Sequence, residues 1–250
     1  MVTKTEIENV IFSGLTNACA DAYHFTGEVN AKIKPEYIVT VNVAKEFFTI
    51  NNGQAGYGHE FILKFEEDTT TFAMACVPQM VADDIFSIKI RGFQNTDRNG
   101  KIDICVYDQF GDKPICPIEI KDFNPSKAEI LKDLKRNLQL LELVDKNTGA
   151  SILKFAFLAV LEEHKNCLTE KNISKGLDKI KAKYEKRLKS FKDNLKDIKL
   201  TITTKTVAKN LIDETTSFAG MEDMDIADRV AETYHFVGVV ITLEKNKSVS

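Results

Sequence analysis

Two short segments rich in isoleucine and valine, followed by a helical pattern and an apolar segment, constrain the fold of this chain most strongly. Residues 101–107 and 115–121 carry the β-branched residues typical of strands, and glycine and proline lie between them. This pattern predicts a β-hairpin. A helix is predicted after Ser126, because apolar residues recur there every three or four positions, and residues 152–161 predict a buried strand.

The segments before the hairpin predict two helices and two further strands. The helices are expected over residues 5–22 and from Pro35, a residue suited to the first helical position, to a turn at residues 51–53. Residues 61–65 and 85–90 resemble strands. The apolar stripe predicted for the second helix consists of Tyr37, Ile38, Val41, Ala44 and Phe48.

A long amphipathic helix and two closing strands are predicted after the hairpin region. Apolar residues recur with a period near 3.5 across residues 171–199, while charged residues fill the other face. Residues 199–207 and 235–243 predict the strands. All these elements together predict an α/β fold in which helices flank a mixed central β-sheet.

The composition is that of an ordinary globular protein, with 43% hydrophobic and 28% charged residues. No repeat or linker divides the chain, so one domain is predicted over residues 1–250. Its core is expected over about 30–165, and the long helix and closing strands over 166–250. No segment approaches the roughly 20 apolar residues of a membrane span, and the first residues do not resemble an export signal.

The five cysteines are scattered without a CxxC pair, and the four histidines have no zinc-type spacing. This argues against a structural zinc site and against a cysteine protease. Reduced thiols are the simplest interpretation, and they predict a cytoplasmic protein.

The charge of the chain is distributed unevenly. The net charge is −3, but residues 165–199 hold twelve Lys or Arg against five Asp or Glu, which is about +7. Three interpretations of this basic helix remain open: a solvated face covering the core, a dimer seam, or a contact with nucleic acid.

Asp103, Glu119 and Lys121 form the pattern that indicates chemistry. In a strand, residues two apart share a face, so Glu119 and Lys121 project together while Ile118 and Ile120 point inward. Pairing of the two hairpin strands would bring Asp103 beside them. We expect Glu119 and Lys121 to face solvent, although the same alternation also suits an ordinary edge strand.

Two carboxylates and an ammonium group on one sheet surface suit the hydrolysis of phosphodiesters. Asp103, Glu119 and the carbonyl oxygen of Ile120 are hard oxygen ligands of the kind that Mg²⁺ prefers, and Mn²⁺ would be accepted similarly. A bound metal ion polarises the phosphate and activates water. Lys121 would orient the water and stabilise charge on the phosphate oxygens.

These residues resemble the motif of the PD-(D/E)xK nuclease superfamily, which includes many restriction endonucleases and phage-defence nucleases. The resemblance lies in Gly100-Lys101-Ile102-Asp103 on one strand and Glu119-Ile120-Lys121 on the next, with a helix directly after. Ile102 stands where the family has proline. The resemblance implies a restriction-endonuclease-like core, Mg²⁺ as cofactor and DNA as substrate.

The resemblance also implies an acidic residue from a helix before the sheet. Glu36 is our first choice, with Glu46 and Glu60 as rivals. Family members often place polar residues in the helix after the motif, where Asp133, Arg136 and Gln139 are spaced by three. We expect the contacts with nucleic acid to come from Lys101, Arg136 and Gln139.

The sequence therefore predicts a Mg²⁺-dependent DNA endonuclease with a restriction or defence role. A catalytically inactive nucleic-acid-binding or assembly protein of the same fold is the alternative, and an RNA-directed nuclease is another. No separable DNA-reading motif is present. Sequence specificity would then come from loops within the domain or from a specificity or helicase partner chain, or be absent. A homodimer is expected because the two strands of a duplex need two centres.

Overall fold

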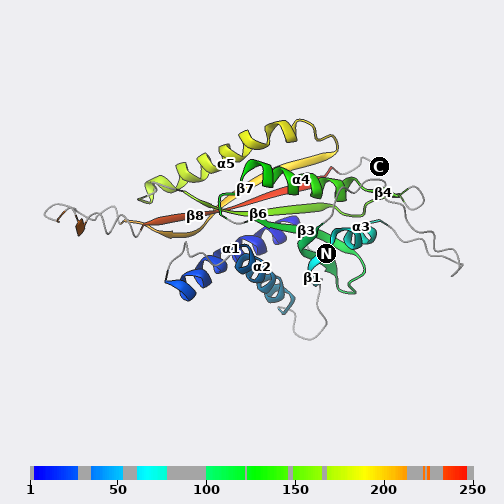
Figure 1. Cartoon of the computed structure of the whole chain (residues 1–250), viewed down its shortest axis with the longest axis horizontal. Coiled ribbons are helices and arrows are strands. Elements are labelled where there is room, and N and C mark those ends of the chain that lie inside the picture. The colour runs from blue at the N-terminus through cyan, green and yellow to red at the C-terminus, as the bar shows by residue number, and fades with distance from the viewer. Residues whose placement is uncertain are drawn as a thin grey trace, which may run out of the picture.

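Six strands form one mixed sheet in the order β1-β2-β3-β6-β8-β7 in the computed structural model (Figure 1). Among the described strands of this sheet, only β3 and β6 are parallel neighbours, and the other neighbouring pairs are antiparallel. The six strands are β1 (Phe61–Asp68), β2 (Lys101–Asp108), β3 (Pro114–Lys121), β6 (Phe155–Glu163), β7 (Ile198–Asn210) and β8 (Tyr234–Lys245). A separate two-stranded sheet pairs β4 (Val144–Asp145) with β5 (Gly149–Ala150).

The structure describes residues 3–27, 35–52, 61–77, 100–121, 123–145, 149–164, 168–212, 222, 224–225 and 233–246. The strand predicted at residues 85–90 lies outside this part of the chain. Within it, no helix is long and apolar enough to cross a membrane.

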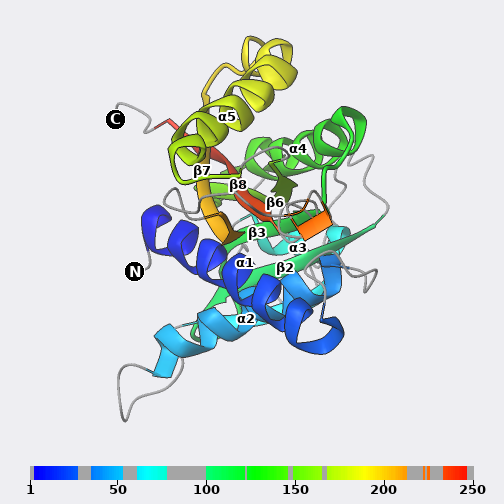
Figure 2. The ribbon, with the colours of Figure 1, turned by 90° about the vertical axis from the view of Figure 1, so that its left-hand side faces the viewer.

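Helices cover both faces of the six-stranded sheet (Figures 1 and 2). One face carries α1 (Lys4–Thr26) and α2 (Pro35–Asn52), which pack against each other. The other face carries α4 (Lys127–Glu142) and α5 (Lys171–Lys192), and the short α3 (Thr69–Ala75) packs beside β1 and β2. This arrangement confirms the predicted α/β class with a mixed sheet flanked by helices.

Each face of the sheet has its own apolar core. Val106, Ile118 and Phe157 lie in the core under α1 and α2, whereas Leu158, Val160 and other residues lie in the core under α4 and α5. Both the hairpin strands and the closing strands β7 and β8 contribute to these cores. The segment over 166–250 is therefore built into the same sheet as the predicted core over 30–165.

Local signals explain where α4 begins. The Ser126 hydroxyl accepts a hydrogen bond from the N–H of Glu129, and the Glu129 carboxylate accepts one from the N–H of Ser126. This reciprocal cap satisfies donors that the first helical turn leaves free. It fixes the start of α4 a few residues after the end of β3.

Two sequence-based expectations about helices are wrong in detail. The buried side of α2 consists of Val39, Asn42, Val43 and Phe47, whereas Tyr37 is 74% exposed. This side of α2 is buried because α1 packs against it, with Val43 directly beside Gly14. The long helix ends at Lys192 rather than 199, because Ile198 already belongs to β7 and pairs with Lys245.

Candidate active site

Asp103 lies where the ladder between β2 and β3 ends. The paired residues of these strands run as far as Ile104 and Ile118. One residue further, the Asp103 carboxylate accepts a hydrogen bond of 2.6 Å from the backbone N–H of Ile120. A side-chain oxygen thus takes the role of a backbone acceptor, which holds the carboxylate against β3.

The backbone around Asp103 is irregular in two strands. Ile102 and Ile104 are two residues apart on β2, yet they lie in the cores on opposite faces. A regular strand would place both on one face. Across from them on β1, Glu66 lies between the residues paired with Ile102 and Ile104 and has a φ of 50°, which is uncommon for a non-glycine residue. The break in alternation directs Asp103 at the backbone of β3.

The side chain of Glu119 projects from β3 on the face covered by α4, as the predicted alternation requires. Ile118 and Ile120 lie in the core on the opposite face. Only 2% of the Glu119 side chain is exposed, and its Oε1 lies 3.8 Å from Nη2 of Arg136 on α4. The expectation that Glu119 faces solvent is therefore wrong, because side chains of α4 cover it.

The ammonium group of Lys121 is surrounded by oxygens from three elements. Its Nζ lies 3.1 Å from Oε1 of Glu36, 3.1 Å from Oδ2 of Asp133 and 3.1 Å from the carbonyl oxygen of Ile120. Burial disfavours the charged amine, but Asp133 and Glu36 outweigh this effect and raise the pKa of Lys121. Lys121 is a fixed cation at the end of β3.

Asp133 connects the two cations of the site. Its Oδ1 accepts a hydrogen bond of 2.7 Å from Nη1 of Arg136, while Oδ2 faces Lys121. Its side chain is 2% exposed. Spacing alone did not single out this residue, but a usable signal was present: Asp133 adjoins Leu134 within the stripe that α4 buries. An acid inside an apolar stripe requires a buried partner.

Glu36 is the acidic residue from a preceding helix that reaches the site. It lies in the first turn of α2 and pairs with Lys121. Its rival Glu46 instead accepts a hydrogen bond from Asn17 on α1. Glu60 lies outside the described residues. Among the acids of the described chain considered for this role, the structure brings Glu36 to Lys121.

The three residues expected to contact nucleic acid are placed differently. The Arg136 side chain is 19% exposed and donates to the carbonyl oxygen of Lys101 over 3.1 Å. The side chain of Lys101 is exposed at the start of β2. Gln139 is half-buried on α4 and does not line the hollow beside Lys121. Arg136 is thus mainly engaged inside the protein, and Lys101 is the accessible cation.

The environment of Asp103 raises the pKa of its carboxyl above the usual range of an aspartate. Burial raises the pKa of this carboxyl to about 6, and the negative charges of Glu36 and Glu66 act in the same direction. The hydrogen bond from Ile120 and the charge of Lys121 oppose the shift. A cation beside Asp103 would therefore favour its ionised form.

An open hollow of about 490 Å³ borders this cluster, and Glu36, Lys121, Asp133 and Arg136 line it. Asp103 and Glu119 do not belong to its lining. Lys121 and Arg136, with their partners Glu36 and Asp133, therefore border the hollow, whereas the carboxylates of Asp103 and Glu119 are not part of its wall.

The chemistry of the donors fits a magnesium ion. Asp103, Glu119 and the Ile120 carbonyl offer hard oxygens, and Mg²⁺ commonly uses one or two carboxylates together with water and substrate phosphate. No three His, Cys, Asp or Glu side chains of the described residues are grouped to hold an ion. A site with two carboxylates and one carbonyl needs no third acidic ligand, and it suits Mn²⁺ as well.

The geometry therefore supplies acidic oxygens, a fixed cation and an open hollow at one end of β3. Glu36, Asp103, Glu119 and Asp133 are the acids, and Lys121 and Arg136 are the cations. If all six are ionised, the cluster carries a net charge of −2, which a divalent cation would balance. No protein-family model, curated protein or solved structure matches this chain.

Proposed function

We propose that this protein is a Mg²⁺-dependent endonuclease that hydrolyses phosphodiester bonds in DNA. The observation that carries the proposal is the meeting of Glu36, Asp103 and Lys121 at one end of β3, although they come from distant parts of the chain. Glu119 lies on the same strand, two residues from Lys121. Acidic oxygens beside a fixed cation are the groups that phosphate-ester hydrolysis requires.

Each residue has a distinct role in the proposed reaction. Asp103, Glu119 and the Ile120 carbonyl oxygen would hold the metal ion, whose chemistry is to polarise the phosphate and lower the pKa of water. Lys121 orients the attacking water and stabilises negative charge on the phosphate oxygens. Glu36 and Asp133 keep Lys121 protonated and fix the position of its ammonium group.

The order of elements supports a restriction-endonuclease-like core. Helix α2 precedes the antiparallel strands β1, β2 and β3, and α4 then leads to β6, which is parallel to β3. Asp103 lies near the start of β2, and Glu119 and Lys121 lie at the end of β3. We extend the proposal to membership of the PD-(D/E)xK superfamily and to a restriction or phage-defence role in the cytoplasm.

The proposed substrate contacts follow the exposure of the candidate residues. Lys101 is placed to meet a phosphate, whereas Arg136 would have to exchange part of its contact with Asp133 for one with substrate. Gln139 is a peripheral contact in this proposal. Cutting both strands of a duplex requires two such centres, so we include a homodimer or a partner chain in the proposal.

A non-catalytic nucleic-acid-binding or assembly protein is the second candidate. The observation that favours it is the internal pairing of the site: Lys121 is bound by Glu36 and Asp133, and Arg136 is bound by Asp133. Such pairs are also consistent with a purely structural cluster. Metal-dependent cleavage separates the two candidates.

The deciding experiment measures cleavage of supercoiled, linear and single-stranded DNA and of RNA, with Mg²⁺ or Mn²⁺ present. The wild-type protein is compared with Asp103→Asn, whose amide oxygen still accepts the hydrogen bond from Ile120. Asp178→Asn, the same change at an exposed carboxylate of α5, is the matched control. We expect metal-dependent cutting by wild type and control, and a loss of roughly a hundredfold or more in Asp103→Asn.

The outcomes of this comparison distinguish between the candidate functions. Cutting of RNA alone would move the proposal to an RNA-directed nuclease. Equal cutting by wild type and Asp103→Asn would overturn the assignment of Asp103. Binding of nucleic acid without any cleavage would favour the non-catalytic candidate.

A further inference from the structure

The exposed lysines of α5 border a groove against the free edge of the sheet. The apolar stripe of this helix is buried: Ile180, Tyr184 and Leu188 belong to the core under α4 and α5. This burial settles one interpretation of the stripe, because residues packed on the sheet are not available as a dimer seam. The function of α5 beyond the core must come from its other faces.

Two basic residues of α5 are engaged on the flank that faces the candidate active site. Lys183 pairs with buried Glu162 over 2.7 Å, and Arg187 donates to the carbonyl oxygen of Pro125 over 3.2 Å. Pro125 also lines the hollow beside Lys121. This flank therefore ties α5 to the wall of the candidate site.

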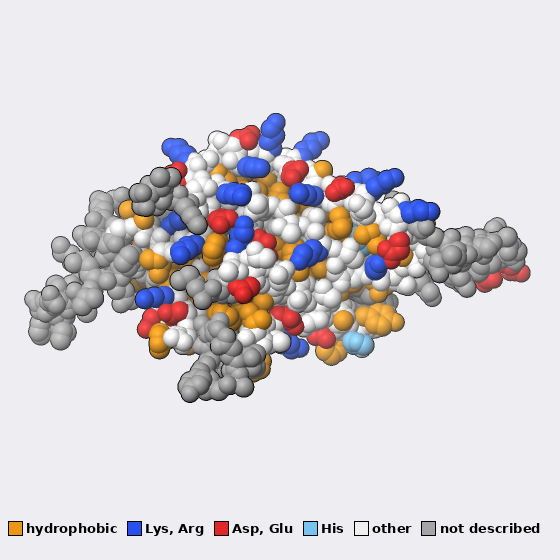
Figure 3. Space-filling model, turned by 180° about the vertical axis from the view of Figure 1, so that it is seen from behind, with side chains coloured by type: hydrophobic (Ala, Val, Ile, Leu, Met, Phe, Trp, Pro, Cys, Tyr) orange, Lys and Arg blue, Asp and Glu red, His pale blue; other side chains and the backbone are white. Residues whose placement is uncertain are grey.

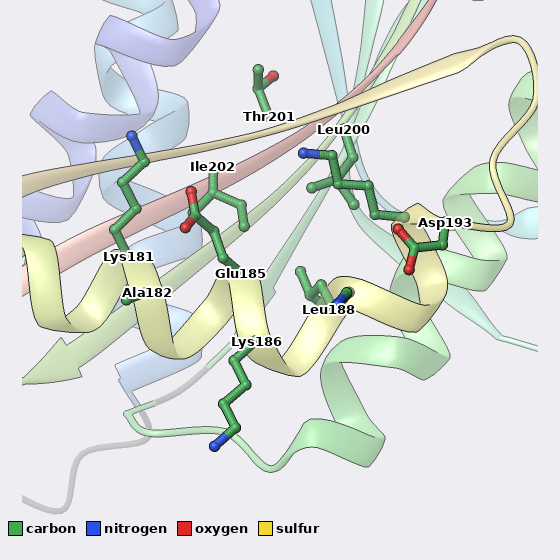
Figure 4. Close-up of a pocket in the computed structure, with 11 residues that line it drawn as sticks. Lys181, Ala182, Glu185, Lys186, Leu188, Asp193, Leu200, Thr201 and Ile202 are labelled. Carbon is green, nitrogen blue, oxygen red and sulfur yellow. The ribbon is translucent and has the colours of Figure 1, made fainter.

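The opposite flank of α5 has lysines without such partners. A groove of about 690 Å³ runs between α5 and β7, and we call it the lysine groove after Lys181, Lys186, Lys189 and Lys192, which line it (Figure 4). In the part of the chain that the structure describes, none of these four side chains forms an ion pair or a hydrogen bond. Lysine and arginine side chains gather along this side of the molecule (Figure 3).

The charge of the lysine groove remains positive after its acids are counted. Glu185 and Asp193 line it together with the four lysines, so the lining residues carry a net charge of +2; the Lys186 side chain points away from β7 in Figure 4. Leu188 and Ile202 form part of its apolar floor. Among the strands that the structure describes, β8 is the only neighbour of β7 in the six-stranded sheet, so the groove lies beside an edge strand.

We propose that the lysine groove holds the phosphodiester backbone of the nucleic acid that the candidate active site cleaves, an inference that rests on the proposed function. Lys181 and Lys192 are separated by about 16 Å along the helix axis at a rise of 1.5 Å per residue. That length spans several phosphates of one strand. The polyanion is favoured over an acidic peptide because α5 borders a phosphodiester-type site on its other flank.

Lys181, Lys189 and Lys192 bind the backbone, whereas Lys183 and Arg187 do not, because their side chains are bound to Glu162 and Pro125. The long helix then separates two functions, with positioning of the backbone on one flank and chemistry beside the other.

The test measures the binding of labelled single-stranded and duplex oligonucleotides by fluorescence anisotropy across a salt series, without divalent metal, so that no cleavage occurs. The groove variant is Lys181→Gln/Lys189→Gln/Lys192→Gln. The matched control is Lys45→Gln/Lys113→Gln/Lys154→Gln, which removes three exposed lysines away from α5. Thermal melting of each variant verifies folding, and all six lysines are exposed.

We expect the groove variant to lose at least about tenfold in affinity at moderate salt, and its salt slope to fall by roughly 2 to 3, while the control behaves as wild type. A groove variant with wild-type affinity and slope overturns the inference and leaves the proposed function standing. Wild type that binds poly-glutamate but neither DNA nor RNA overturns the inference in favour of an acidic protein partner. That last result would also overturn the proposed function, whereas wild-type behaviour of the groove variant overturns the inference alone. The failure of the inference and the failure of the proposed function are therefore distinguishable.

Discussion

The Asp103 carboxylate accepts a hydrogen bond of 2.6 Å from the backbone N–H of Ile120, at the point where β2 and β3 cease to pair. This single contact joins the fold to the candidate chemistry. It satisfies a backbone donor that the ladder leaves free, and it holds a carboxylate beside the carbonyl group of the same residue. The structural and the proposed catalytic roles of Asp103 can be separated by comparing its substitution by asparagine with its substitution by alanine.

Asp103→Asn and Asp103→Ala should therefore differ in stability. The asparagine keeps an oxygen acceptor for Ile120, whereas alanine leaves the N–H without its partner and should lower the free energy of unfolding by about 1–3 kcal/mol. Urea denaturation of the metal-free variants measures the difference. Equal stability of the two variants would show that water or another acceptor replaces the carboxylate.

Glu119→Ala should destabilise the protein, whereas the removal of a solvent-exposed side chain would have little effect on stability. The side chain is 2% exposed and lies beside Arg136, so its removal creates a space and leaves the guanidinium with less compensating charge. We expect a loss of about 2 kcal/mol, and a smaller loss for the nearly isosteric Glu119→Gln. Thermal and urea unfolding test this order, and the reverse order would contradict the described packing.

Asp133→Asn should lower the pKa of Lys121, because the largest charge that favours its ammonium form would be gone. The ¹³Cε chemical shift of Lys121, followed through a pH titration by NMR, reports this pKa directly. Asp178→Asn serves as the matched control, since it removes an exposed carboxylate from α5. An unchanged Lys121 titration in Asp133→Asn would mean that Glu36 alone fixes the ammonium group.

If Lys121 acts in cleavage, the same Asp133→Asn variant should reduce kcat more than it raises KM. Asp133 does not supply a proposed metal ligand, so its effect on the reaction runs through Lys121 and Arg136. We expect a loss of roughly tenfold to a hundredfold, as for other residues that orient a reacting group. A variant that raises KM alone would place Asp133 in substrate binding instead.

The histidine pair His164 and His235 should make stability depend on pH. Their Nδ1 atoms lie 3.2 Å apart, and burial, His164 and Lys209 together lower the pKa of His235 to about 4, against a weaker opposing effect of Glu170. The unfolded chain binds a proton near pH 6.5, but the folded protein does not. The stabilisation is therefore complete above pH 6.5 and is lost as the pH falls towards 4.

The measurement compares wild type with His235→Gln in urea denaturation at several pH values. Relative to this variant, the free energy of unfolding of wild type should fall by about 2 kcal/mol between pH 7 and pH 5. Thr206, whose hydroxyl lies 2.9 Å from Nε2 of His235, offers a hydrogen-bonding partner to the glutamine as well. Parallel stability curves for the two proteins would show that another group controls the pH dependence.

Gly14→Ala should shift α2 and, with it, Glu36. A Cβ at Gly14 would lie 2.5 Å from the Cα of Val43, and a backbone atom cannot move aside as a side chain can. We expect a loss of stability of about 1–3 kcal/mol from overpacking. Ser13→Ala, at the neighbouring exposed position, is the control. Unfolding by urea checks the effect, and wild-type stability in Gly14→Ala would show that α1 and α2 separate easily.

Local sequence patterns were sufficient to predict the central elements of the fold. Alternating isoleucine and valine identified β2 and β3, and the spacing of apolar residues after Ser126 identified α4, because these signals act within a few residues. The same alternation correctly placed Glu119 and Lys121 on one face of β3. Glu36 was also foreseen, but from a family resemblance rather than from its own surroundings.

Only the tertiary structure decided which side of each element is buried and which charges meet. Tyr37, Val41 and Phe48 had the better apolar stripe in α2, yet Gly14 lets α1 approach the side that carries Val43. Burial of a helix face depends on a neighbour that is distant in sequence, so a local pattern cannot select it.

The charge cluster shows the same division. The sequence by itself determined that Asp103, Glu119 and Lys121 lie on adjoining strands, since strand alternation and hairpin pairing are local properties. The burial of Glu119 and the bridge from Asp133 to Lys121 and Arg136 were decided only when α4 packed against β3. The strength of an interaction between two charged side chains depends on the distance between them. Side chains from different elements come close to one another only when the two cores of the fold have formed.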